Sequence, residues 1–381
     1  MKGLAIAGWK NIDVERGISI SIQSRMLFIE LLQIALGNRG KLSRIPTRKE
    51  WLDLYQESEK QSILGIMLGG LELLPDEQSP PQDILLQWIG FVQMIEQNTI
   101  AMAKASVEAV GYFQEKGFAC TLLKGAAVGR YYPNSDRRQS GDIDVWLDGG
   151  RERIYDYART FDKEGKLYGV NYQHIHFHLF DDIPLEVHVW PACLSNPLHN
   201  RRFHQFCAIH HPIMEQSMPS LAFDRVFILM HCYNHMTGNG VGLRQIMDYY
   251  FVLKQGFTKE EKDDSVRWIK KLGMYRFASG LMWLMQYAFG MEDKYLLMEP
   301  NEKEGRFILQ EVMMTGNMGH SDIRNWGSQK TAFKRFIHNL RRDAYLINHY
   351  PQEIIFQPFF SLWLYFWRLS KGLLGSEDND N

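Results

Sequence analysis

The sequence contains few cysteines, and none of them is placed in a metal-binding or disulfide pattern. Among 381 residues there are four, Cys120, Cys193, Cys207 and Cys232, and no two of them form a C-x-x-C pair. Such scattered cysteines give no support for a zinc ribbon or a disulfide framework. We expect reduced, mostly buried thiols in a cytoplasmic protein.

Charge of one sign is not in excess either. Lys and Arg number 43 and Asp and Glu number 44, which gives a formal net charge of −1. A protein that binds long nucleic acid normally has a strongly basic face. The balance therefore favours a small molecule or a protein as the partner.

The chain also lacks a hydrophobic run long enough to span a bilayer. The longest uncharged stretch near its end is Ile354–Trp367, 14 residues rich in aromatic side chains, whereas a span needs about 20. We expect a buried helix here, with an interfacial helix as the alternative. Gly and Lys interrupt residues 1–10, so we expect no signal peptide and a cytoplasmic location.

Length and periodicity predict three parts without internal repeats. At 381 residues the chain is too long to fold around one small core, and we expect two or three units. Residues 1–81 are expected to be helical and to end at Pro80–Pro81, 82–215 to form a core opened by the amphipathic helix Gln82–Glu115, and 216–381 to be helical again. Thr47–Glu50 and Thr258–Glu261 have the spacing of helix capping boxes.

Two aspartates one residue apart mark the most informative stretch, 141–147. Asp142 and Asp144 lie in a β-branched, apolar run with Ile143 and Val145. Because a strand turns alternate side chains to opposite faces, the two acids are expected on one face and the apolar residues in the core. Two carboxylates so close repel each other unless a cation lies between them, and oxygen ligands suit Mg²⁺.

The segments on either side of this strand complete a pattern. Upstream, 118–123 predicts a strand that ends at Lys124 and Gly125, where a turn opens a helix and its free N–H groups favour an anion such as a triphosphate. Downstream, Leu185–Trp190 predicts a strand with Glu186 and His188 on its polar face. It pairs in a β-hairpin with the strand expected over 174–180.

This order of motifs resembles the nucleotidyltransferase fold of the DNA polymerase beta superfamily. More closely, it is similar to an uncharacterised bacterial nucleotidyltransferase family with the pattern Lys-Gly, Tyr-Pro, Arg-x-x-x-Asp-Ile-Asp and acid-x-His-Trp. The matching residues are Lys124–Gly125, Tyr132–Pro133, Arg138, Asp142, Asp144, Glu186, His188 and, one residue later than in the family, Trp190. Ala126 stands where the superfamily has Gly or Ser.

The resemblance implies an α+β protein with a small mixed-sheet nucleotidyltransferase core flanked by helical regions. It implies transfer of a nucleoside monophosphate from an NTP to an acceptor hydroxyl, with Mg²⁺ or Mn²⁺ and release of pyrophosphate. The expected catalytic residues and metal ligands are Asp142, Asp144 and Glu186. The expected nucleotide-binding residues are Lys124, Gly125, Ala126, Arg138 and His188.

Several alternatives stay open at this point. Glu186 could instead form an ion pair with Arg137 or Arg138. The alternating histidines His174, His176 and His178 raise the possibility of a zinc-dependent hydrolase. A nucleotide-binding or antitoxin-like module without catalysis is the alternative for the whole chain.

Two features of the C-terminal helical part could form a cleft wall. His231 and His235 lie one helical turn apart, and the flexible turn 238–244 after them could close over a nucleotide. Arg244 precedes Asp248 by four residues, which predicts an ion pair within one helix.

Overall fold

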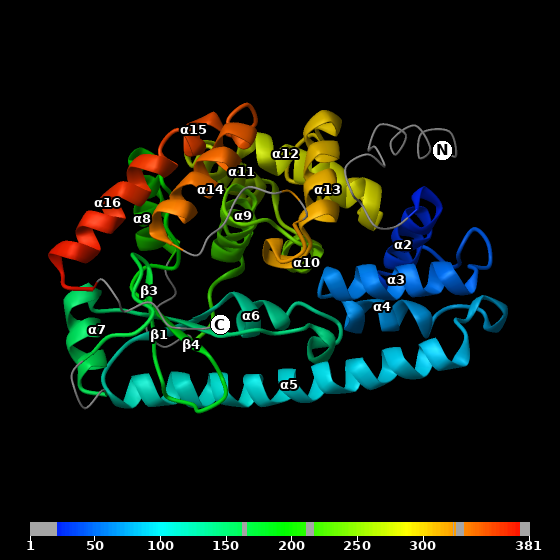
Figure 1. The fold of residues 1–381 in the computed structure, drawn as a ribbon, viewed down its shortest axis with the longest axis horizontal. Helices are drawn as coiled ribbons and strands as arrows, with labels where there is room; N and C mark the ends of the chain where they lie inside the picture. Colours follow the sequence, from blue (N-terminus) through cyan, green and yellow to red (C-terminus); the bar gives the residue numbers. More distant parts are fainter. Residues whose placement is uncertain (1–20, 162–165, 211–216, 323, 325–330, 374–381) are drawn as a thin grey trace.

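A small mixed sheet lies among many helices in the computed structural model, which describes residues 21–161, 166–210, 217–322, 324 and 331–373 (Figure 1). The strands are β1 (Cys120–Leu123), β2 (Ile143–Leu147), β3 (His174–His176) and β4 (Leu185–His188), in the order β1-β2-β4-β3. β2 is parallel to β4, whereas β1 and β3 are antiparallel to their neighbours. The prediction of the α+β class is confirmed.

The two faces of this sheet have different chemistry because its strands alternate polar and apolar residues. Ile143, Val145, Val187 and Ile175 point to one face and are fully buried. Asp144, Glu186 and His188 belong to the other face, as expected from the sequence. The apolar face fixes the strand register, since a slip by one residue would turn every side chain over.

Helix α5 (Gln82–Glu115) covers the apolar face of the sheet and has the bounds predicted from the sequence. Its second half packs Ala109 and Phe113 into the core beneath the sheet. Its first half packs Ile84 and Trp88 into a separate core with the N-terminal helices. With 34 residues, this helix extends about 50 Å and lies along one side of the molecule in Figure 1.

The remaining α-helices come before, between and after the strands in the sequence. Those that begin before residue 200 are α2 (Ile22–Ala35), α3 (Arg48–Lys60), α4 (Leu64–Leu71), α6 (Lys124–Gly129), α7 (Gly150–Arg159) and α8 (Pro197–His210). Those that follow are α9 (Leu221–Thr237), α10 (Leu243–Lys254), α11 (Lys259–Lys271), α12 (Tyr275–Leu284), α13 (Glu302–Thr315), α14 (Ala332–Leu346), α15 (Pro351–Ile354) and α16 (Gln357–Ser370). Both predicted capping boxes are present, at the starts of α3 and α11.

Helices from the beginning and the end of the chain share one buried core. The side chain of Asn38, after α2, donates a hydrogen bond of 2.6 Å to the Phe289 carbonyl, after α12. Gln33 on α2 likewise donates to the Tyr287 carbonyl at 3.1 Å. The division at residues 81 and 215 therefore stays a prediction.

One strand is shorter than the sequence suggested. The strand expected over 174–180 ends at His176, and it pairs with β4 as the predicted hairpin partner.

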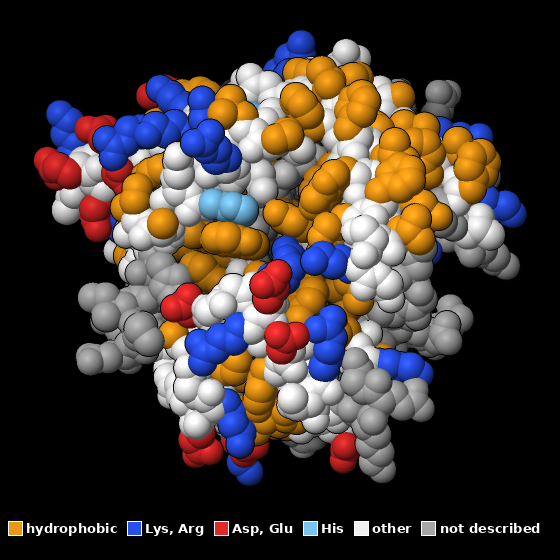
Figure 2. Space-filling model, turned by 90° about the vertical axis from the view of Figure 1, so that its left-hand side faces the viewer, with side chains coloured by type: hydrophobic (Ala, Val, Ile, Leu, Met, Phe, Trp, Pro, Cys, Tyr) orange, Lys and Arg blue, Asp and Glu red, His pale blue; other side chains and the backbone are white. Residues whose placement is uncertain are grey.

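The prediction of a buried helix near the end of the chain is wrong. No residue of α16 is buried, and Phe359 and Phe366 are 69% and 55% exposed. Figure 2 shows hydrophobic side chains gathered on this side of the molecule. Apolar composition predicts burial only if another element covers the helix, and within the described residues none covers this face. No helix in the part of the chain that the structure describes has the length and apolar character needed to cross a membrane.

Glycines let α4 pack closely against its neighbours. A Cβ atom at Gly65 would lie 2.2 Å from the carbonyl oxygen of Arg137, and one at Gly70 would lie 3.0 Å from Cβ of Ala35. Since Arg137 precedes Arg138, this contact supports the loop that leads into β2.

We predict opposite effects of adding a methyl group at two helical glycines. Gly65→Ala should lower the free energy of unfolding by about 1–3 kcal/mol, because backbone atoms must move. Gly90→Ala on α5, where nothing lies within 4 Å, should raise it by about 0.5–1 kcal/mol. Urea unfolding measures both; stabilisation by Gly65→Ala would disprove the close contact.

Candidate active site

Three carboxylates converge on the polar face of the sheet, near the start of its two inner strands. Asp144 lies on β2 directly opposite Glu186 on the parallel strand β4, and Asp142 precedes β2. One oxygen atom from each of the three lies within 4.8 Å of the others. The predicted convergence of these side chains is therefore observed, whereas their roles stay predictions.

Two basic side chains lie against the buried carboxylate of Asp144. The Lys124 ammonium donates to Asp144 Oδ1 at 2.7 Å, and Nε2 of His188 lies 2.7 Å from the same oxygen. Burial acts to raise the pKa of Asp144, but Lys124 and His188 outweigh it and hold this pKa well below its usual range. No hydrogen bond from a described residue reaches the other oxygen, Oδ2.

His188 has oxygen atoms beside both ring nitrogens. Nε2 lies 3.3 Å from Glu186 Oε2 as well as against Asp144, and Nδ1 lies 3.2 Å from the Trp190 carbonyl. Burial acts to lower the pKa of His188, but its bonds to the two carboxylates raise it. The ring thus connects the two acids.

Asp142 is the least compensated of the three acids. Repulsion by the charge of Asp144, together with burial, raises the pKa of Asp142 to about 6. A divalent cation would relieve this repulsion, and a set of carboxylate oxygens is the donor set that Mg²⁺ and Mn²⁺ prefer. Asp142, Asp144 and Glu186 therefore fit such an ion.

The predicted trio of histidines does not form a site of its own. His174 joins Glu186 and His188 in a second group that could hold a metal, and burial lowers the pKa of His174 to about 3. His176 lies on the same face, 3.7 Å from Glu186. The ring of His178 packs instead against Tyr168. Neither His176 nor His178 belongs to a metal-capable group of the described residues.

Helices α9 and α10 supply the wall opposite the carboxylates. They enclose with them a cavity of about 310 Å³, lined on this side by His231, Asn234, His235, Gly238, Asn239, Arg244, Gln245 and Asp248. The turn after α9 thus takes part in the cavity, as the sequence suggested. Burial lowers the pKa of His235 to about 4 and holds that of His231 well below its usual range, which favours the neutral form of both rings.

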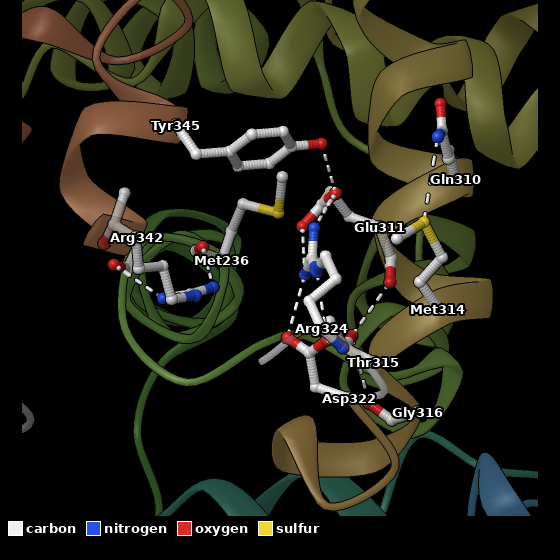
Figure 3. Close-up of polar contacts among 11 residues, drawn as sticks. Met236, Gln310, Glu311, Met314, Thr315, Gly316, Asp322, Arg324, Arg342 and Tyr345 are labelled. Atoms are coloured by element: carbon white, nitrogen blue, oxygen red, sulfur yellow. Dashed lines mark hydrogen bonds and ion pairs between the residues drawn. The ribbon is translucent and has the colours of Figure 1, made fainter. Parts of the chain in front are cut away.

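Arg342 on α14 anchors the end of α9. Its guanidinium donates to the carbonyls of Thr237 and Met236 at 3.0 and 2.9 Å (Figure 3). These are among the last carbonyls of the helix, which lack partners within it. Helix α14 therefore holds the end of α9, which forms part of the cavity wall, in place. In the same view, Arg324 binds both Glu311 and Asp322.

Arg138 is bound to a residue of α10. Its Nε and Nη2 donate to the two oxygens of Asp248 at 2.7 and 2.8 Å, and the Tyr132 hydroxyl donates to Asp248 at 2.6 Å. The predicted ion pair between Arg244 and Asp248 is therefore wrong. The four-residue spacing within a helix does not show whether a side chain from another element binds the same carboxylate. Here Arg138 binds both oxygens of Asp248.

The alternative ion pair of Glu186 with an arginine is wrong as well. Arg137 binds Glu72 and Glu96, and Arg138 binds Asp248. Glu186 lies instead among His174, His176 and His188, so it remains available to the cavity.

The sequence argument placed Arg244 in a possible cleft wall but not among the nucleotide-binding residues. Its Nη1 donates to the Gln139 carbonyl at 3.0 Å, while its buried Nε has no hydrogen-bond partner among the described residues. It lines the cavity with Asp142. In the sequence, Arg244 stands at the start of a helix directly after a glycine-rich turn, and this position was the feature that pointed to a ligand-binding arginine.

The backbone at the predicted phosphate turn is unusual at Lys124 rather than at Gly125. Lys124 has φ +41°, in the left-handed region, which costs energy for a residue with a Cβ atom. A Cβ at Gly125 would lie 3.5 Å from the Asp142 carbonyl, an ordinary contact. Ala126 follows within α6.

A family model described as uncharacterised nucleotidyltransferase matches residues 47–290, more than half of the chain. The chain belongs to this nucleotidyltransferase family. The match includes the sheet, the three carboxylates and the wall formed by α9 and α10, and it bears out the resemblance seen in the sequence motifs. No curated protein and no solved structure matches the chain.

In this nucleotidyltransferase, the buried pair between Arg138 and Asp248 joins the sheet region to the C-terminal helices. We predict that Asp248→Asn lowers the free energy of unfolding by about 3–5 kcal/mol, because it leaves a buried guanidinium without its counter-charge. Asp83→Asn is the matched control, since it breaks an exposed pair with Arg48 and should change little. Equal losses of unfolding free energy in the two variants, measured by urea unfolding, would contradict the claim that the buried pair contributes more than the exposed one.

Proposed function

We propose that this chain transfers a nucleoside monophosphate from an NTP to an acceptor hydroxyl in the cytoplasm. In this reaction the acceptor oxygen bonds to the α-phosphorus, the bond from that phosphorus to the oxygen bridging it to the β-phosphate breaks, and pyrophosphate leaves. The observation that carries the proposal is the convergence of Asp142, Asp144 and Glu186 in a cavity of a nucleotidyltransferase family member.

The three carboxylates share one role in the proposal, and Glu186 has a second. Asp142, Asp144 and Glu186 would hold Mg²⁺, or Mn²⁺ in its place, which neutralises the negative charge of the triphosphate. Glu186 accepts the proton of the acceptor hydroxyl. His188 positions Asp144 and Glu186 through its ring, because it lies within 3.3 Å of both.

The cations of the cavity are proposed to bind the triphosphate. Arg244 supports this role best, because it lines the cavity and its Nε has no hydrogen-bond partner among the described residues. Arg also binds phosphate oxygens through a fork of two donors. Lys124 and Arg138 line the same cavity beside Gly125, although each already binds a carboxylate.

The acceptor is proposed to be a small molecule. A second cavity of about 190 Å³ adjoins the first and shares Gly238 and Asn239 with it. It is lined by the amides of Asn339 and Gln357 and by Asp343, which is 7% exposed. No described residue donates a hydrogen bond to the Asp343 carboxylate, so a ligand hydroxyl or amino group would satisfy it.

The test supplies each α-³²P-labelled NTP, ATP among them, with Mg²⁺ and separated fractions of cell extract. We predict pyrophosphate release and label in the small-molecule fraction. Asp142→Asn with Asp144→Asn should reduce release by about 10³-fold or more. The control double variant, Asp148→Asn with Asp156→Asn, removes two exposed acids outside the cavity and should act as wild type.

Two results would overturn this proposal. A folded Asp142→Asn, Asp144→Asn variant with wild-type turnover would exclude the carboxylate mechanism. NTP binding by the wild type without pyrophosphate release in any fraction would favour the alternative, a nucleotide-binding or antitoxin-like module without catalysis.

A second prediction concerns Arg244. Arg244→Gln should weaken NTP binding by about 10–100-fold, since hydrogen bonds to a charged group contribute about 1.5–3 kcal/mol each. Arg48→Gln, which changes an exposed arginine on α3, should leave the affinity unchanged. Calorimetric titration with a non-hydrolysable NTP measures both, and equal affinities would remove Arg244 from the phosphate site.

A further inference from the structure

Helix α16 exposes an unusual number of large apolar side chains. Those at least 45% exposed in and just before it are Ile355, Phe359, Leu362, Trp363, Tyr365, Phe366 and Leu369. Most recur every three or four residues, so they form a continuous stripe along one side of the helix. Single exposed apolar residues are normal, whereas a contiguous patch marks a surface that binds something.

The other side of α16 is fixed to the protein. The Trp367 ring lies 6.1 Å from the ring of Tyr172, and the guanidinium of Arg151 lies 5.0 Å from the Trp367 ring. α16 also contacts α14 and α15. The exposed stripe is therefore presented by a helix held in a defined orientation.

The charges around this stripe are mostly positive. Between residues 331 and 373 the exposed charged residues are Lys334, Arg335, Arg341 and Lys371. The two acids of this segment, Asp343 and Glu353, are buried, at 7% and 2% exposure. Lys371 shares a cavity with α7, where Arg151 and Arg159 accompany the acids Glu152 and Asp156. The described residues of this face therefore have a local excess of cations, although the whole chain has a net charge of −1.

We propose that α16 binds the surface of an anionic phospholipid bilayer, with its apolar stripe between the headgroups and its neighbouring cations against the phosphates. An apolar stripe containing Trp and Phe beside Lys and Arg is the pattern of helices that lie in the interface. Trp and Tyr are favoured there, because one end of each ring is apolar and the other is polar. With 14 residues, the helix is too short to span the bilayer.

A second copy of the chain fits this face less well. In a two-fold dimer through α16, each stripe would meet the same stripe of the partner. The cations of the two copies would then approach one another, and such like-charge contacts oppose association. An anionic bilayer complements both the stripe and the charge.

Co-sedimentation of the full chain with phospholipid vesicles tests this proposal. The chain should pellet with vesicles of phosphatidylcholine mixed with phosphatidylglycerol, and less with vesicles of phosphatidylcholine alone. Leu362→Ser with Phe366→Ser should lower the partition coefficient at least about tenfold, because it removes buried apolar area. Lys334→Gln with Lys371→Gln should lower it about fivefold per lysine, for the anionic vesicles only.

The matched control changes two exposed apolar residues of another helix. Leu86 and Met94 on α5 are 60% and 58% exposed, and Leu86→Ser with Met94→Ser should bind vesicles as the wild type does. Failure of the wild type to pellet with anionic vesicles would overturn the proposal. So would equal loss in both serine variants, or a dimer in light scattering that only the α16 variant dissociates.

Discussion

The convergence of three carboxylates on one face of a small sheet is the constraint on which the rest of the structure depends. Strand alternation places Asp144 and Glu186 on one face, and their charges are tolerated because Lys124 and His188 lie against them. Asp142 has no such partner among the described residues, and its pKa is raised to about 6 by the neighbouring charge of Asp144. A further cation would compensate this charge.

Parts of the chain far apart in sequence hold the carboxylates and the cavity around them in place. Arg138 binds Asp248 on α10, so the loop before β2 is tied to the helices that form the opposite wall. Gly65 on α4 packs against the backbone of Arg137, and Arg342 on α14 secures the end of α9. The cavity is therefore a product of the whole fold rather than of the sheet alone.

Local patterns in the sequence predicted the features that depend on neighbouring residues. Strand alternation around Asp142 and Asp144, the bounds of α5 and both capping boxes follow from such patterns, and the structure confirms them. The sequence could not predict the partner of Asp248, because Arg138 comes from a distant segment. Nor could it predict the exposure of α16, since apolar composition does not show whether another element covers a helix.

Binding of Mn²⁺ followed by electron paramagnetic resonance tests the central claim most directly. The account predicts that the wild-type chain binds Mn²⁺ in the presence of a non-hydrolysable NTP. It also predicts that Asp142→Asn with Asp144→Asn abolishes this binding while the protein stays folded. Undiminished Mn²⁺ binding by the folded double variant would contradict the account, because the ion would then be held by other residues.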